Sequence, residues 1–491
     1  MKKKPINRDY WSICEKCKGM GRVSKRLRKK IRLAYKNALA EYLKNNQVGI
    51  EPLKPKSIFE KCDPCNGSGL IKTHTAPAVA TENYPHISIV GAGIGGVALG
   101  VACLHRGIPF TLFEKDAQFS ARSQGYALTL QQASKALKSF GILSLEESVV
   151  STRHLVHNTT GEVIGEWGMR KWQEERSKKP LRQTNIHISR QSLRKSLLAE
   201  LHGEKKLLWG HELINIKEDE SQKMALHFKV QEKLKKYHTD LIVGADGIRS
   251  AVRNWGIGEE KTPLNYLGCM VILGICSLDH IQGVAPGLLD GETVFQTANG
   301  KERIYIMPYD KASIMWQLSF PIKEDEAKKL RDLGPEKLKE VARDCTQWHS
   351  PIPEIIVATE VEKISGYPVY DRALLDPKSL QKHDKLTLIG DAAHPMSPFK
   401  GQGANQALLD AIALARSITK GCMPGSEWRE KGIRSSVLNN FESEMLKRSA
   451  VKVKDSAAAA QFLHSEQVMR ESNAPRGAHL KENTSFILNN L

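Results

Sequence analysis

The feature that most constrains how this chain can fold is a glycine-rich turn between two apolar runs, within residues 86–114. His86–Val90 predicts a strand, the small residues of Ala98–Arg106 predict a helix, and Pro109–Phe113 predicts a second strand. A strand, a tight turn, a helix and a second strand in this order form a βαβ unit. The sequence therefore predicts an α/β fold that contains a Rossmann-like part.

Three glycines of this turn have the spacing G-x-G-x-x-G, and an acid follows the third glycine by 18 positions. Gly91 permits the tight turn, Gly93 lets backbone approach a pyrophosphate, and Gly96 lets the helix pack on the strand. The helix N-terminus directs unpaired N–H groups at phosphates, and Glu114 is placed to accept hydrogen bonds from ribose hydroxyls. These parts occur in register, so we predict a dinucleotide site rather than an ordinary turn. Its candidate residues are Gly91, Gly93, Gly95, Gly96, Glu114 and Lys115.

The composition is that of a globular protein with an uneven charge. Hydrophobic residues make up 41% and charged residues 26% of the 491 positions, and no apolar run reaches the ~18 residues that a membrane span needs. The basic N-terminus lacks the apolar core of a signal peptide, so we expect a cytoplasmic protein. Of the net charge of +19, +13 lies in the first 80 residues, which hold 19 Lys and Arg against 6 Asp and Glu.

Two cysteine pairs in residues 1–72 share the pattern C-x-x-C-x-G-x-G. Four thiolates are the number that a closed, structural zinc site needs, and the glycines permit turns that present two sulfurs to one metal. The repeats resemble the cysteine-rich domain of DnaJ-type chaperones, in which repeats separated by an insertion share one zinc. No J-domain accompanies them, so chaperone activity is not implied. The alternatives are redox-active pairs or coincidence. The predicted zinc ligands are Cys14, Cys17, Cys62 and Cys65.

Between the pairs, Val23–Asn45 predicts an amphipathic helix with a basic face. That face is a candidate surface for nucleic acid or a protein partner, and the alternative is a solvated helix face. Residues 73–83 are small and polar and predict a linker. Because the remainder of the chain has its own core, we expect it to keep its fold without the metal.

Two further stretches, Arg122–Leu130 and Ile186–Leu198, resemble flavoprotein monooxygenases of the para-hydroxybenzoate hydroxylase type. A third, Asp240–Ser250, runs from an apolar strand into Gly-Ala-Asp-Gly and resembles that family's second fingerprint. The resemblance implies contacts with the flavin or with NADPH. The alternative is a surface salt bridge for Arg194 and a capped turn for Asp246. The candidate residues are Arg122, Thr129, Arg194 and Asp246.

The most specific stretch of the chain is Leu386–Asn405, which resembles the family's G-D-A-A-H-x-x-x-P-x-x-G-Q-G-x-N element. The resemblance implies that Asp391 binds the ribityl chain, that Pro398 lies beside the flavin ring, and that His394 belongs to the flavin loop. A predicted helix, Gln402–Arg416, places a positive helix N-terminus near the ring. The candidate residues are Gly390, Asp391, Pro398, Gly401, Gln402, Gly403, Ala404 and Asn405.

Within residues 261–370, β-like runs from Met270 to Phe320 alternate with turns and predict an antiparallel sheet, and Ala327–Thr346 predicts an amphipathic helix. In the family that it resembles, such a sheet covers the flavin ring and forms the substrate pocket. The candidate substrate residues are Phe295, Gln296, Tyr305, Met307 and Trp316, and each has the alternative of simple core packing. Asn439–Leu463 predicts one long C-terminal helix.

The predicted organisation is a zinc module (1–72), a linker (73–83), an FAD-binding part (84–260), a substrate-binding sheet (261–370), a second FAD-binding part (371–423) and a C-terminal helical region (424–491). The resemblance implies that NAD(P)H, with NADPH favoured, reduces FAD. Reduced flavin and O2 then give a C4a-hydroperoxide, which transfers one oxygen atom to an aromatic or polyketide-like small molecule.

Three hypotheses about function stay open on the sequence. The first is this aromatic hydroxylase, which resembles the tetracycline-inactivating branch through Arg122–Leu130 and Phe295–Gln296. The second is a related halogenase or double-bond reductase, although the halogenase string W-x-W-x-I-P does not occur. The third is a binding or sensor protein in which the basic zinc module is the functional part. The sequence assigns no general base.

Overall fold

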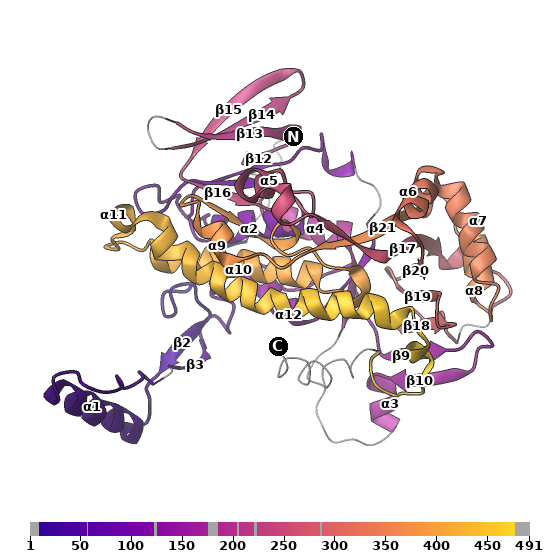
Figure 1. Cartoon of the computed structure of the whole chain (residues 1–491), viewed down its shortest axis with the longest axis horizontal. Coiled ribbons are helices and arrows are strands. Elements are labelled where there is room, and N and C mark those ends of the chain that lie inside the picture. The colour runs from indigo at the N-terminus through magenta and orange to yellow at the C-terminus, as the bar shows by residue number, and fades with distance from the viewer. Residues whose placement is uncertain are drawn as a thin grey trace.

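The computed structural model describes residues 9–55, 57–121, 125–174, 185–203, 206–219, 223–284 and 287–476. Two sheet-based halves lie side by side, and the long helix α12 (Asn439–Leu463) runs along both of them (Figure 1). The predicted bounds of this helix are confirmed. It packs against α10 (Gly403–Gly421) in one half and β17 (Leu264–Ser277) in the other, and so braces the two halves.

The first half is built on a five-stranded parallel sheet in the order β12-β6-β5-β16-β22. The predicted βαβ unit supplies its centre, and both β5 and β16 are buried along their whole length, as expected for a parallel sheet covered on two faces. The strands are β5 (Ile87–Val90), β6 (Phe110–Phe113), β12 (Leu207–Leu208), β16 (Leu241–Gly244) and β22 (Leu386–Leu388).

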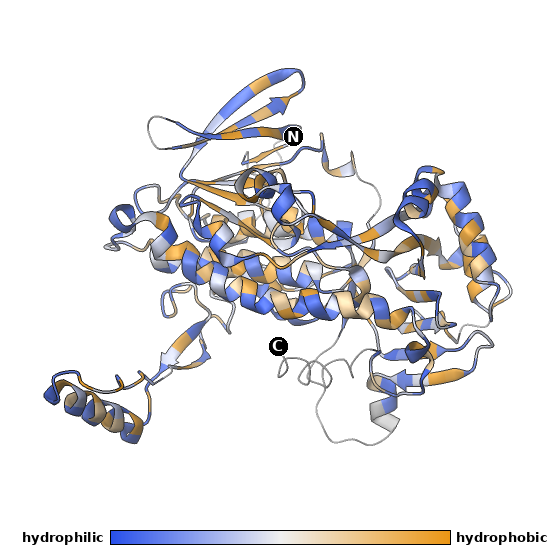
Figure 2. Cartoon of the chain, viewed as in Figure 1, coloured by the Kyte–Doolittle hydropathy of each residue, from blue (hydrophilic) through white to orange (hydrophobic). Residues whose placement is uncertain are grey.

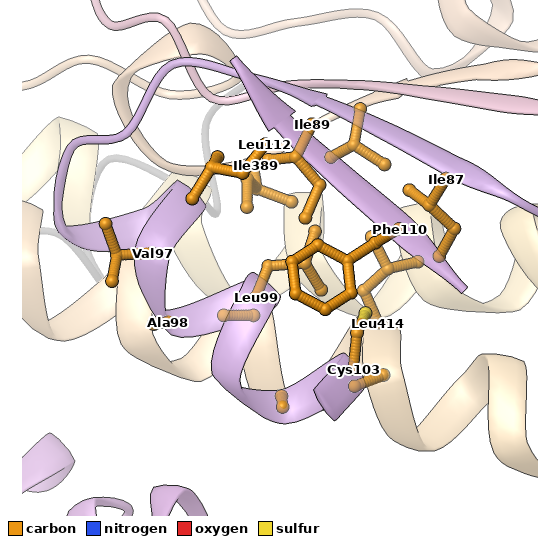
Figure 3. Close-up of a cluster of buried hydrophobic side chains, with 14 of the residues drawn as sticks. Ile87, Ile89, Val97, Ala98, Leu99, Cys103, Phe110, Leu112, Ile389 and Leu414 are labelled. Carbon is orange, nitrogen blue, oxygen red and sulfur yellow. The ribbon is translucent and has the colours of Figure 1, made fainter. Parts of the chain in front are cut away.

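Helices α2 (Ile94–Leu104) and α10 pack on this sheet and on each other. Figure 3 shows the core between them, where Ile87, Ile89 and Phe110 from the sheet meet Leu99 of α2 and Leu414 of α10. In Figure 2 the strands of this sheet are among the most hydrophobic parts of the chain. The other helices of this half are α4 (Arg190–Ala199), α5 (Ala251–Ile257), α9 (Pro377–Gln381) and α11 (Trp428–Ile433).

Two smaller antiparallel sheets complete the first half. The order β7-β11-β8 joins β7 (Ala127–Leu130), β11 (Ile186–Ser189) and β8 (Val149–Val150) beside the start of α10. The order β13-β14-β15 joins β13 (His211–Glu218), β14 (Met224–Val230) and β15 (Lys233–Thr239), which project from the edge of the molecule (Figure 1).

The second half is a seven-stranded sheet in the order β10-β9-β18-β19-β20-β17-β21, antiparallel except at the β9–β18 pair. The predicted sheet is confirmed, but two strands come from residues 84–260, which we expected to belong wholly to the FAD-binding part. In addition to β17, the strands of this sheet are β9 (Arg153–His157), β10 (Val163–Trp167), β18 (Thr293–Ala298), β19 (Arg303–Pro308), β20 (Ser313–Pro321) and β21 (Ile364–Arg372).

Helices cover one face of this sheet, and α3 (Met169–Glu174) follows β10. The single helix predicted at Ala327–Thr346 is wrong, because Gly334, with φ of +87°, and Pro335 end one helix and start another. The covering helices are α6 (Glu324–Asp332), α7 (Pro335–Cys345) and α8 (Ile352–Ala358).

The N-terminal residues form two small ribbons and one helix outside both halves. Strands β1 (Tyr10–Ile13) and β4 (Leu70–Thr73) pair, as do β2 (Arg22–Lys25) and β3 (Ile58–Lys61). The predicted helix is shorter than expected, since Val23 pairs with Glu60 in the second ribbon and α1 spans only Lys29–Lys44. Helix α1 buries none of its residues and stands clear of the body, with polar and apolar residues mixed along it (Figures 1 and 2).

Candidate functional site

A cavity of about 560 Å³ lies where the two halves meet. One side is formed by β7 and by the segment from Pro395 to Ala404, and the other side by strands of the seven-stranded sheet. The sequence stretches that resemble flavoproteins and the predicted substrate sheet therefore share one cavity.

The glycine turn after β5 is packed tightly except at its middle glycine. A Cβ atom on Gly91, whose φ is +101°, would lie 2.6 Å from the carbonyl oxygen of Ala245, and one on Gly96 would lie 1.8 Å from the Gly91 oxygen. A Cβ on Gly93 would meet nothing closer than Arg190 Nη2, at 3.8 Å. Gly93 is also the N-cap of α2 and offers no side chain to cap the helix amides. The turn thus leaves space at Gly93 for a pyrophosphate. The first amides of α2 have no side-chain cap and can donate to that group.

Glu114 and Arg194 lie together behind this turn. Glu114 is buried, and its carboxylate accepts a hydrogen bond from the Ala92 amide at 2.8 Å. Arg194 donates from Nε to the Ala92 carbonyl at 2.7 Å and lies 3.7 Å from the Glu114 carboxylate. The pair therefore fixes the shape of the turn. Lys115 is exposed, and Gly95 faces α10, where a Cβ on Gly95 would lie 3.4 Å from the Ala407 Cβ.

Asp246 acts as a helix cap in the structure. Its carboxylate accepts hydrogen bonds from the Ser250 hydroxyl at 2.5 Å and from the Ala251 amide at 2.7 Å, at the start of α5. Asp246 thus caps the start of α5 rather than a turn, and its direct contact with a cofactor stays a prediction. Arg122 lies outside the described residues.

The stretch Leu386–Asn405 turns back on the start of α10 and lines the cavity. The Asp391 side chain is accessible from the cavity, and a Cβ on Gly403 would lie 3.4 Å from its Oδ1. Gln402 is the N-cap of α10 and makes no side-chain cap, so the first amides of this 19-residue helix stay free at the cavity wall. Pro398, Gly401, Gly403 and Ala404 line the same wall, whereas Gly390 lies behind it.

Asn405 and Gln402 connect this wall to β7. Asn405 is fully buried, accepts from the Gln131 amide at 2.9 Å and donates to the Thr129 carbonyl at 2.8 Å. Gln402 Nε2 donates to Gln131 Oε1 at 2.7 Å. These side chains hold two segments of the cavity wall together.

A buried ion pair that the sequence did not reveal supports the Gly390–Asp391 turn. Asp410 of α10 accepts from the Gly390 amide at 2.8 Å, lies 2.7 Å from His394 Nε2, and accepts from Arg448 of α12 at 2.7 Å. Burial opposes charge on His394, but the Asp410 carboxylate outweighs it and raises the pKa of His394. Burial likewise opposes charge on Asp410, but His394 and Arg448 lower its pKa.

The opposite wall of the cavity is made by alternate residues of β18, β19 and β20. Gln296, Tyr305 and Met307 line it, as predicted. Phe295 and Trp316 do not: both are fully buried in the core beneath the sheet, where Trp316 donates to Thr359 at 2.9 Å. Successive strand residues point to opposite faces, so Phe295 and Gln296 cannot both face the cavity. The prediction for Phe295 and Trp316 is therefore wrong.

The structure adds a chain of hydrogen bonds that no motif indicated, and this chain connects β7 on the first wall with β9 of the seven-stranded sheet. Thr129 bonds His187 Nδ1 at 3.1 Å, His187 Nε2 bonds Ser151 at 2.7 Å, and Ser151 bonds His154 Nε2 at 3.2 Å. Burial lowers the pKa of His187 to about 3 and that of His154 to about 4. Both rings are therefore neutral at physiological pH and serve as hydrogen-bonding groups.

Several cations line the cavity (Arg249, Arg303, Arg331, Lys400 and Arg476), and Arg303 lies on the wall formed by the seven-stranded sheet. Arg303 is 6% exposed, and Nε donates to Gln296 Oε1 at 2.6 Å. Burial lowers the pKa of Arg303 to about 10, so its guanidinium is still charged at neutral pH. No carboxylate pairs with it among the residues that the structure describes.

The four cysteines predicted as zinc ligands form one buried cluster. Their sulfur atoms all lie within 4.8 Å of one another, with 3.9 Å between Cys14 and Cys62 and 3.7 Å between Cys17 and Cys65. A tetrahedron with Zn–S bonds of about 2.3 Å places its sulfurs about 3.8 Å apart. The amides of Gly21 and Gly69 donate to Cys17 and Cys65 at 3.2 and 3.3 Å. The donor set and its spacing fit one tetrahedral zinc ion.

Comparison with known proteins finds a matching family and several relatives. The family described as FAD binding domain matches residues 85–439. Aurachin C monooxygenase/isomerase from Stigmatella aurantiaca is 26% identical over 362 residues, covering 72% of this chain and 86% of that protein. Chloroplastic zeaxanthin epoxidase from an Oncidium hybrid cultivar is 28% identical over 379 residues, 75% of this chain, which spans only 54% of that protein's length.

The fold is shared with a solved flavoprotein. Klebsiella pneumoniae HpxO, in complex with FAD and uric acid, superposes with a TM-score of 0.64 at 18% identity, covering 82% of this chain and 95% of HpxO. Among the described residues, none of the helices combines the length and apolarity that crossing a membrane requires.

Proposed function

We propose that this chain, which belongs to the FAD binding domain family and is an FAD-dependent monooxygenase, takes its electrons from NAD(P)H and transfers one oxygen atom of O2 to an aromatic or polyketide-like small molecule. The observation that carries this proposal is the shared cavity, which has the glycine-rich wall and the free N-terminus of α10 on one side and a polar, aromatic wall on the other.

When bound, FAD supplies the redox chemistry and the activation of O2. The residues that we propose for holding it are the Gly93 turn with Arg190 at the pyrophosphate, Asp391 at the ribityl chain, and the amides of Gly403 and Ala404 beside the ring. The N-terminus of α10 adds positive potential, which favours negative charge on the ring. Since the sequence has one G-x-G-x-x-G only, we expect NAD(P)H to reach the ring without a domain of its own.

The wall opposite gives the substrate its orientation. Arg303 is a buried cation with donors to spare, and the ring of Tyr305 lies 4.8 Å from its guanidinium carbon. A guanidinium pairs best with a carboxylate, phenolate or enolate oxygen. We therefore propose a substrate that carries such an anionic oxygen next to its ring. The neutral rings of His154 and His187 position further polar groups of the substrate or of the cavity wall through hydrogen bonds.

Electron transfer and oxygen transfer are tested together. Purified protein should retain FAD and oxidise NADPH faster with one member of a library of anionic aromatic compounds, and mass spectrometry should find one 18O in the product formed under 18O2. Arg303→Met should raise KM for that substrate about 10- to 100-fold and leave FAD content unchanged, whereas Arg343→Met, an exposed arginine of α7, should change neither. NADPH oxidation that yields only hydrogen peroxide with every compound would contradict the proposed oxygen transfer.

For the N-terminal module we propose one structural zinc ion held by Cys14, Cys17, Cys62 and Cys65. Four thiolates leave no open position for water, so we expect no hydrolytic chemistry there. Elemental analysis should find one zinc per chain. Cys14→Ser should abolish most of it, while Cys345→Ser, a cysteine outside the cluster, should keep it.

A further inference from the structure

The cysteine cluster is docked on the FAD-binding half through two arginines. Arg106, two residues after α2 ends, donates from Nη2 to the carbonyl of Gly19 at 3.4 Å. Arg416 of α10 donates from Nη2 to the carbonyl of Ser68 at 3.3 Å. Gly19 and Ser68 belong to the glycine-rich turns that follow the two cysteine pairs, so each arginine reaches one half of the cluster.

These two cations lack a counter-charge in the protein. Arg106 is only 4% exposed and Arg416 is partly buried, and neither pairs with a carboxylate among the described residues. The Nε atoms of both arginines are buried, and neither has a hydrogen-bond partner among the residues that the structure describes. Burial, and then the charge of Arg416, lower the pKa of Arg106, and both guanidinium groups lie within electrostatic reach of the cluster. Buried cations of this kind are costly unless an anion compensates them.

The cluster supplies that anion once it holds zinc. Four thiolates and one Zn²⁺ carry a formal charge of about −2, which is equal and opposite to the charge of the two guanidinium groups. Resting on the zinc site proposed above, we propose that the zinc tetrathiolate is the counter-ion of Arg106 and Arg416, and that metal binding thereby holds the N-terminal module on the FAD-binding half and stabilises that half.

The placement of the arginines connects the metal to the cofactor site. They lie toward the C-terminal parts of α2 and α10, the two helices whose N-terminal ends line the proposed FAD site, and these helices pack against each other. The linker is fixed as well, since the Ala80 amide donates to the Gly107 carbonyl at 2.9 Å and Trp428 donates to the Asn83 carbonyl at 2.8 Å. Loss of zinc should therefore weaken FAD retention, contrary to the independence that the sequence predicted.

The test compares metal removal in two full-length proteins. Zinc is removed with a chelator from folded wild-type protein and from the Arg106→Met/Arg416→Met variant, and the temperature at which flavin fluorescence appears on heating is measured before and after. In the wild type, chelation should lower this temperature by about 5–10 °C. In the variant, which no longer needs the counter-charge, the shift should be less than half as large. Arg343→Met serves as the matched control and should show the wild-type shift.

The outcomes separate the zinc site from its proposed role. Absence of zinc in the wild type would overturn both. Zinc that is present but whose removal shifts wild type and variant equally would overturn the counter-ion role and leave the site. If the double variant does not fold, the single variant Arg416→Gln replaces it, because the Arg416 side chain is only partly buried. A temperature shift in this variant equal to that of the wild type would overturn the counter-ion role. None of these measurements depends on monooxygenase turnover, so failure of the proposed reaction would be seen separately.

Discussion

The two walls of the cavity are built on different principles. The wall that we assign to FAD is made largely of backbone, namely the segment Gly401–Ala404 and the uncapped N-terminus of α10. The rest of the proposed FAD site, outside the cavity lining, is the glycine turn at the uncapped start of α2. The wall that we assign to the substrate is made of side chains that project from a sheet, such as Gln296, Arg303 and Tyr305. A backbone wall fits one ligand and tolerates little change, whereas a side-chain wall can change its ligand while the strands stay in place.

The largest expected effect comes from adding a side chain to the glycine turn of the proposed FAD site. Gly96→Ala would place a Cβ 1.8 Å from the Gly91 oxygen, and no flexible atom can move to relieve the clash. We expect a destabilisation above about 4 kcal/mol and loss of bound FAD, measured by chemical unfolding and by the flavin absorbance of purified protein. Gly95→Ala is the matched control, since its Cβ would lie at 3.4 Å from Ala407. Equal FAD content in the two variants would contradict the assignment of this glycine turn to the FAD site.

The next effect concerns the ion pair behind the second turn. Asp410→Asn removes the charge that His394 and Arg448 share, and breaking such a buried pair costs about 3–5 kcal/mol. Because the pKa of His394 is raised, its contribution is present below the ordinary value of 6.5 and is lost as pH rises through the raised value. The contribution of Asp410, whose pKa is lowered, is present above 3.8 and is lost only in acid.

Thermal unfolding from about pH 5 to 9 checks this sign. The advantage of wild type over Asp410→Asn should be largest on the acidic side of this range and should shrink as pH rises. An advantage that grows with pH would show that His394 is neutral in the folded protein.

An effect of similar size on stability separates the two faces of the sheet. Phe295→Ala opens a hole in the core beneath the sheet and should cost about 3–5 kcal/mol of stability, with little change in KM for a substrate found as above. Tyr305→Phe, on the cavity face, should leave stability within about 1 kcal/mol and raise KM. Chemical unfolding and steady-state kinetics on both variants would show the reverse pattern if the faces were assigned wrongly.

The two walls also differ in how far the sequence could predict them. Gly96 is required by a contact inside the turn, with the Gly91 oxygen, whereas Gly91 is required by its contact with Ala245 after the neighbouring strand β16. The spacing of the glycines was nevertheless enough to identify the turn. Every residue of β18 is buried, so hydrophobic alternation could not tell which of Phe295 and Gln296 faces the cavity. The chain from Thr129 to His154 joins three strands of two sheets and has no local signal. The break at Gly334-Pro335, in contrast, was readable from the residue types alone.

The same holds for the N-terminal module. The spacing of the cysteines predicted their cluster, but the contacts of Arg106 and Arg416 with Gly19 and Ser68 join residues 87 and 348 positions apart, and only the fold brings them together. The alternatives that the sequence left open for this module, nucleic acid or a protein partner, stay predictions.

The smallest expected effect concerns the basic helix of this module. Helix α1 has no acidic residue in its first turn and no buried residue, so its cations are free to meet phosphates. If full-length protein binds RNA or DNA, the binding should weaken steeply between about 50 and 200 mM salt in a fluorescence titration. The Lys29→Gln/Lys30→Gln/Arg32→Gln variant should weaken it uniformly across sequences and leave flavin content unchanged. Absence of binding at low salt would leave α1 as a solvated helix.

The ribbon of β2 and β3 gives the module a property beyond binding. Lys25 pairs with Ile58, so the chain leaves the ribbon and returns to it at the same point. Everything between these two residues can be lengthened, shortened or exchanged with little entropic cost, because closing a longer loop on a fixed base becomes only slowly less favourable. The loop between Lys25 and Ile58 is thus a site at which a new segment can be inserted, in evolution or by design, without a change to the two sheet-based halves.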